Sequence, residues 1–159
     1  MNISKLVDAA HDALLEQNFS LASGIYTMLC DEGERKGDQI LIAHAKEHLG
    51  IIAMMSGDFD TWRRLLEEAL AHLEETGNIK LQSGLLDILG GNEIDHFKRK
   101  AHLERNLVLK QNLGDVVGQI TVLNASGTLQ WRVATSLPLN PTVNGQKNSR
   151  DEQHSVQGR

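Results

Sequence analysis

Two histidines and one glutamate, His44, Glu47 and His48, form the pattern in this chain that is best suited to chemistry. Residues four apart on a helix lie on one face, so the two imidazoles could share a zinc ion. The glutamate between them could then take a proton from a zinc-bound water molecule. The pattern therefore indicates metal-dependent hydrolysis as one chemistry to be weighed.

This pattern resembles the H-x-x-E-H motif of the inverted zinc peptidases. That resemblance implies a large mixed α/β fold and a third metal ligand from a distant segment. The present chain has 159 residues, its hydrophobic pattern is helical, and it shows no segment that would supply the ligand. A polar patch on a helix is the favoured interpretation of residues 44–48, and a zinc-dependent hydrolase is a remote alternative. We expect no catalytic residue, no bound metal and no cofactor.

The other reactive side chains indicate surface or packing positions. His96 and His102 are six residues apart and do not share a helix face well. Cys30 is the single cysteine, so we expect a buried apolar residue in a reducing cytoplasm and no internal disulfide. The basic run at 98–100 has no groove-reading motif, and the net charge of −5 argues against nucleic-acid binding.

Length and hydropathy predict one globular, cytoplasmic domain. A chain of 159 residues can bury a core without disulfides. No window of about 18 apolar residues is present, so we expect no membrane span. The first residues carry acidic and polar side chains at helical spacing, unlike the apolar centre of a signal peptide.

Glycines recur at a regular spacing, which indicates an internal repeat. Gly37, Gly77 and Gly114 each precede Asp or Asn, with spacings of 40 and 37 residues. Glycine enters the left-handed conformation without a Cβ penalty, so we expect these three to end helices. Thirteen residues after each lies a second glycine: Gly50, Gly90 and Gly127. We expect the second set inside helices at close helix–helix approaches, because an interior glycine costs about 1 kcal/mol against alanine.

Apolar residues at i, i+3, i+4 and i+7 predict seven helices arranged as antiparallel pairs. The predicted spans are 3–16, 19–36, 39–56, 60–76, 79–90, 95–112 and 115–134. Gly90, Gly91 and Asn92 predict a softer, more mobile joint in the third pair. From Ser136 onward the chain is polar and contains both prolines, so we expect disorder. The predicted organisation is a helical domain over 1–135 and a tail over 136–159.

The second helix pair resembles the tetratricopeptide repeat (TPR), a helix-turn-helix unit. The matching residues are Leu49-Gly50 in the first helix, Gly57-Asp58 at the turn, and Trp62, Leu66 and Ala69 in the second helix. The resemblance covers about residues 3–134 and implies an all-α, right-handed superhelix with a concave groove. The spacing of 37–40 residues exceeds the usual length of about 34, as in the longer repeats of bacterial regulators and scaffolds. Trp62 stands where the family has alanine, so we expect wider packing there.

The resemblance also implies which residues face the groove, because the first helix of each pair lines it. Four groove positions fall on the third helix and four on the last: His44, Glu47, Ile51, Met54, Thr121, Asn124, Thr128 and Trp131. The implied function is a non-catalytic adaptor or scaffold that binds a protein or peptide. The alternative is a peptide- or ligand-responsive regulatory module of a bacterial signalling or transcription system.

The last predicted helix is too apolar for the end of a repeat array, which normally carries a polar cap. Its apolar side chains are Ile120, Val122, Leu123, Leu129, Trp131 and Val133. We expect a second copy of the chain, or another protein, to cover this end. The alternative is that this helix folds back over the third pair.

Overall fold

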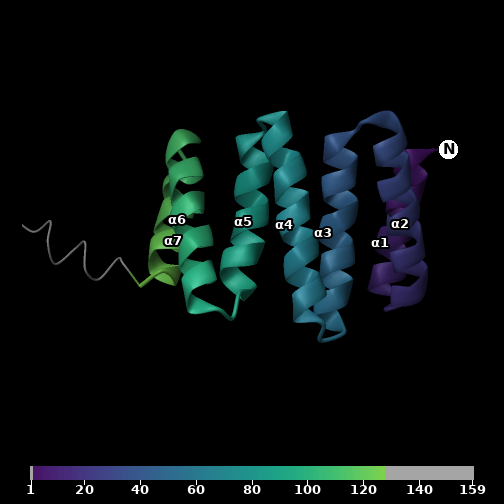
Figure 1. Cartoon of the computed structure of the whole chain (residues 1–159), viewed down its shortest axis with the longest axis horizontal. Coiled ribbons are helices and arrows are strands. Elements are labelled where there is room, and N and C mark those ends of the chain that lie inside the picture. Colours follow the sequence, from purple (N-terminus) through teal and green to yellow (C-terminus); the bar gives the residue numbers. More distant parts are fainter. Residues whose placement is uncertain (1, 128–159) are drawn as a thin grey trace, which may run out of the picture. The chain divides into compact units, whose positions relative to one another are not determined.

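The computed structural model describes residues 2–127, and within them the chain forms seven α-helices and no strand (Figure 1). The helices are α1 (Ile3–Leu15), α2 (Phe19–Lys36), α3 (Gln39–Met55), α4 (Phe59–Thr76), α5 (Ile79–Asn92), α6 (His96–Asn112) and α7 (Val116–Ala125). The all-α class and the helix pairs are therefore as predicted. The predicted tail and the boundary at residue 135 lie outside the described residues.

Each helix begins directly after an Asn or Asp whose side chain accepts a backbone hydrogen bond from the first turn. These N-caps are Asn2, Asn18, Asp38, Asp58, Asn78, Asp95 and Asp115. Such caps satisfy N–H groups that have no partner within the helix, and each stabilises by about 0.5–2 kcal/mol. The repeated caps explain why the helix starts fall within a residue or so of the predicted ones.

The glycines behave as predicted at five of the six repeat positions. Gly37, Gly77 and Gly114 follow helix ends with φ of 66°, 67° and 66°. Gly50 and Gly90 lie inside α3 and α5, each against the following helix. For Gly127 the predicted position inside a helix is wrong. Helix α7 ends at Ala125, and Gly127 lies in the following turn with φ of 68°.

Gly127 occupies the same kind of turn as Gly57, which follows α3 with φ of 81°. The N–H of Gly127 donates to the carbonyl of Asn124, as the N–H of Gly57 donates to that of Met54. The sequence spacing aligned Gly127 with the interior Gly50, but α7 is shorter than α3 and places it past the helix end. The predicted continuation of this helix to residue 134 lies beyond the described part.

Each helix packs against the next one along the chain, and two apolar clusters fill the spaces between them. The first cluster joins α1, α2 and α3, with Tyr26 and Leu29 fully buried. The second joins α3, α4 and α5, with Trp62 and Leu86 fully buried. Since α3 contributes to both clusters, it is packed on two sides, as its apolar sequence predicts.

The joint between α5 and α6 differs from its prediction. Helix α5 does not end at Gly90 but continues to Asn92. Glu93 follows with its side chain fully buried, and the Arg63 guanidinium of α4 binds both carboxylate oxygens at 2.6 and 2.8 Å. The same carboxylate accepts the N–H of Asp95 at 2.9 Å. A buried ion pair therefore anchors the joint that the glycines indicated to be soft.

Candidate functional site

The H-x-x-E-H residues of α3 lie in a cluster of aromatic rings between α1, α2 and α3. The His44 and His48 rings are 4.4 Å apart, and His48 stacks on Tyr26 at 4.6 Å. His11 of α1 meets His48 edge-on at 5.7 Å. The His48 Nδ1 lies 3.0 Å from the backbone carbonyl of His44. These rings pack against one another and tie three helices together.

Burial favours the neutral forms of the His44 imidazole and the Glu47 carboxyl. It lowers the pKa of His44, and the neighbouring His48 and His11 lower it further. Burial also raises the pKa of the Glu47 carboxyl. The Tyr26 pKa rises to about 12, mainly through burial and secondly through Glu47. Within residues 2–127 the buried Tyr26 hydroxyl has no hydrogen-bond partner.

The cluster gives no support to the zinc-hydrolase alternative. In the described part of the chain, no three His, Cys, Asp or Glu side chains are placed so that they could hold a metal ion. The imidazoles of His44 and His48 are tilted against each other and do not converge with a third ligand.

The remaining predicted groove residues are divided between α3 and α7. Ile51 and Met54 are half-buried, and Met54 packs against the second apolar cluster. Thr121 and Asn124 are exposed on α7. Thr128 and Trp131 lie outside the described residues.

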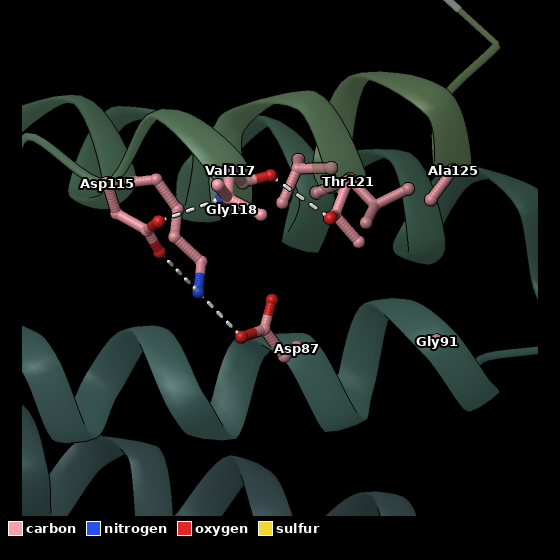
Figure 2. Close-up of a pocket in the computed structure, with 10 residues that line it drawn as sticks. Asp87, Gly91, Asp115, Val117, Gly118, Thr121 and Ala125 are labelled. Atoms are coloured by element: carbon pink, nitrogen blue, oxygen red, sulfur yellow. Dashed lines mark hydrogen bonds and ion pairs between the residues drawn. The ribbon is translucent and has the colours of Figure 1, made fainter.

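A pocket of about 390 Å³ lies among α5, α6 and α7. Figure 2 shows Asp87 and Gly91 on α5 facing Val117, Gly118, Thr121 and Ala125 on α7. Of the eight predicted groove residues, Thr121 lines this pocket and the four α3 residues do not. The pocket thus lies between α5 and α7, with Leu103 and Lys110 of α6 completing its lining.

One end of the pocket is charged. The Lys110 ammonium lies 2.7 Å from Asp87 and 3.5 Å from Asp115. Burial alone would lower the Lys110 pKa, but the hydrogen bonds and charges of the two carboxylates raise it. Gly118 makes room for this arrangement, because a Cβ there would meet the Lys110 stem at 2.6 Å.

Buried amides and hydroxyls hold the charged end in place. Asn106 is fully buried and donates through Nδ2 to Asp87 at 2.6 Å. The Ser83 hydroxyl in turn donates to the Asn106 side-chain oxygen at 2.8 Å. This chain of hydrogen bonds fixes one Asp87 oxygen while 44% of its side chain stays exposed.

The other end of the pocket is apolar. Gly91, Leu103, Val122 and Ala125 line it, and Val117 lies on the rim with 76% of its surface exposed. Thr121 turns its hydroxyl to the Val117 carbonyl at 3.1 Å, so its methyl group remains for apolar contact. The pocket is therefore suited to an apolar group beside a charged or polar one.

Sequence reasoning missed Asp87 and Lys110, which form the charged end. The two residues are 23 apart and belong to no short motif. A charge pattern within a single helix could not have shown them, because they meet only when α5 and α6 pack together.

The structure places His102 and Cys30 only partly as predicted. His96 is exposed, but His102 is half-buried and burial lowers its pKa. Cys30 is half-buried beside the first apolar cluster, and burial raises the pKa of its thiol. A raised pKa leaves the thiol protonated at neutral pH, as expected of a packing residue.

Comparison with known proteins supports the fold alone. No family model matches the chain, and no curated protein matches its sequence. The crystal structure of BtubC (BKLC) from P. vanneervenii is similar, with a TM-score of 0.62 and 19% sequence identity. The similarity covers 80% of this chain and 57% of that one, so the present chain spans little more than half of that protein's length. Among the described residues, no helix is long and apolar enough to cross a membrane.

Proposed function

We propose that this protein is a non-catalytic, TPR-like adaptor that binds a peptide segment of a partner protein. The observation that carries the proposal is the pocket among α5, α6 and α7, with one apolar and one charged end. Peptide-binding sites on helical repeats use this combination, because apolar contact supplies affinity while polar groups fix the orientation. The proposed setting is a reducing cytoplasm, in keeping with a lone cysteine.

The repeat architecture supports the TPR-like assignment. Glycines follow α2, α4 and α6 in the left-handed conformation, and an Asp or Asn cap follows each of these glycines. Repeat arrays of this type present extended surfaces to their partners and need no catalytic residues. BtubC (BKLC) supports the helical fold and carries no argument about the partner.

A peptide library can test the proposal directly. A random peptide library displayed on phage is selected against the full chain and then against Ala125→Trp. The indole fills the apolar end of the pocket, so we expect the enriched peptides to lose binding. The matched control is Ala71→Trp, which places the same side chain on an exposed position of α4 away from the pocket.

Two outcomes would contradict the proposal. One is that no peptide is enriched over an unrelated helical protein. The other is that the enriched peptides bind Ala125→Trp as well as they bind the wild type.

The pocket volume favours one second candidate, a regulatory module that responds to a small ligand. A volume of about 390 Å³ lies within the range of small-molecule sites. A metabolite library screened by thermal shift separates the two. Stabilisation by a small molecule, lost in Ala125→Trp, supports the regulatory module, whereas peptides that bind without such a hit support the adaptor.

A further inference from the structure

The corner between α5 and α6 exposes two large apolar side chains. Ile94 is 72% exposed and Phe97, on the first turn of α6, is 84% exposed. In the first two pairs a phenylalanine at the start of the second helix contacts core side chains, although Phe59 stays 39% exposed. Phe19 contacts the first apolar cluster, and Phe59 meets Trp62 edge-on at 6.5 Å. Phe97 thus has no comparable packing role in the fold.

An ion pair and a helix cap hold the corner that precedes Phe97. Glu93 is buried there, bound to Arg63 and to the N–H of Asp95. Asp95 then caps α6, so His96 takes the first helical position and Phe97 the second. The ion pair and the cap hold the corner in one conformation, and an exposed aromatic on a rigid support loses little entropy on binding.

The same molecule carries a pocket that complements this corner. Its volume is about 390 Å³ in all, and Leu103, Val122 and Ala125 line an apolar end that suits an apolar side chain. At the charged end, Asp87 and Asp115 remain 44% and 41% exposed. Beside Phe97 lie the exposed Lys98 and Lys100, the latter in a surface pair with Glu104 at 3.7 Å that contributes little.

We propose that a second copy of this chain inserts its Ile94–Phe97 corner into the pocket among α5, α6 and α7. Phe97 and Ile94 contact the apolar end, while the neighbouring lysines approach the exposed carboxylates. This inference rests on the pocket of the proposed function and names its partner. The residues of α7 carry no charge, and Lys110 lies between Asp87 and Asp115, which reduces their repulsion of the exposed Asp95 in the incoming corner.

Sedimentation velocity of the full chain over a range of concentrations tests the proposal. We expect the wild type to self-associate, and Phe97→Ser and Ala125→Trp each to weaken the association roughly thirtyfold, as for loss of a hot-spot contact. Raising the salt concentration should also weaken it, since exposed charges are screened. Leu15→Ser is the matched control, because Leu15 is 78% exposed far from the α5–α6 corner in sequence.

Mixing the two variants gives the sharpest result. Phe97→Ser keeps an intact pocket and Ala125→Trp keeps an intact corner, so the mixture should recover association that neither variant shows alone. Circular dichroism must show both variants as helical as the wild type. A monomeric wild type at high concentration overturns the inference, and so does a mixture that fails to recover.

Failure of this inference is separable from failure of the proposed function. If the chain is monomeric but Ala125→Trp still abolishes peptide binding, a different protein supplies the segment and only the second copy is excluded. If the chain associates and Ala125→Trp has no effect on peptides or on association, the pocket itself is excluded as the site.

Discussion

At the scale of single residues, Glu93 supplies the most deeply buried carboxylate among the ion pairs of the described residues. Its carboxylate is fully buried and makes three hydrogen bonds, two from Arg63 and one from Asp95. The Arg63 hydrogen bonds hold the pKa of Glu93 down to about 2, against the smaller opposing effect of burial. The residue ties α4 to the corner that precedes α6.

Replacing Glu93 should therefore be costly. We expect Glu93→Gln to lower the free energy of unfolding by about 3 kcal/mol, because it leaves the Arg63 charge partly buried without its partner. Urea unfolding measures this directly. Asp60→Asn is the control, since Asp60 also pairs with Arg63 but is 99% exposed, and we expect a change within about 0.5 kcal/mol.

The Glu93 pair also predicts a pH dependence with a defined sign. Because the folded pKa lies below the ordinary value of 4.5, the contribution is present above that value and is lost as pH falls toward about 2. The stability difference between wild type and Glu93→Gln should hold from neutral pH down to about 4.5 and then shrink as pH falls further toward about 2. A difference that grows in acid would contradict the assignment.

At Gly50 the close approach of α4 leaves no room for a Cβ atom. A Cβ built there would run into Leu66 Cδ1 and would lie 3.4 Å from the Trp62 carbonyl oxygen. Leu66 is fully buried, so its methyl group has little room to move. We expect Gly50→Ala to lower the free energy of unfolding by about 1 kcal/mol, overpacking outweighing the gain in helix propensity.

Gly84 provides the matched comparison for Gly50. It also lies inside a helix, but a Cβ there would meet nothing within 4 Å. Gly84→Ala should therefore stabilise by up to about 1 kcal/mol. Thermal or urea unfolding of both variants checks the pair, and equal effects would show that Gly50 makes no special helix–helix contact.

At the scale of helices, His44 makes the packing among α1, α2 and α3 dependent on pH. The folded pKa of His44 lies below its ordinary value of 6.5, so the unfolded chain takes up a proton first as pH falls. Stability should therefore decline as pH falls through 6.5 and level off below the folded pKa. Burial also lowers the pKa of His102, so His102 likewise reduces stability as pH falls. The contribution of His44 is therefore measured by comparing the wild type with a His44 variant.

The variant His44→Gln isolates this contribution. We expect it to lose less stability than the wild type between pH 7.5 and pH 5.5, as measured by urea unfolding at each pH. An equal loss in both proteins would show that His44 does not contribute to the acid sensitivity. Hydrogen exchange of α1 should report the same difference locally, since His11 joins α1 to the cluster.

The sequence predicts helices well here because local signals agree. Asn or Asp caps and left-handed glycines mark the helix starts and ends, and both act within a few residues. The predicted end of a helix is wrong where contacts with another helix determine it. Helix α5 continues through Gly90 because Glu93, one turn later, is anchored by Arg63 of another helix.

The candidate site was predicted less well than the helices, for a related reason. A repeat resemblance indicates which helices line a groove, and Thr121 on α7 does line the pocket. It does not indicate where a cavity remains after side chains pack. That His44 and Glu47 face a ligand stays a prediction; in the fold the His44 ring lies against the rings of Tyr26 and His48.

At the scale of the whole described domain, the first helices and the last helices differ in how they pack. The first pairs bury the largest side chains in two cores, and the last helices leave a pocket and an exposed corner. We therefore propose that recognition takes place at α5–α7.

Hydrogen–deuterium exchange of the full chain, with and without a saturating peptide from the phage selection, tests this placement most directly. We predict slower exchange in α5 and α7, with α1 and α2 unchanged. The same peptide should leave exchange in Ala125→Trp unaltered. Protection centred on α3 around His44 and Glu47, with α5 and α7 unchanged, would contradict the account.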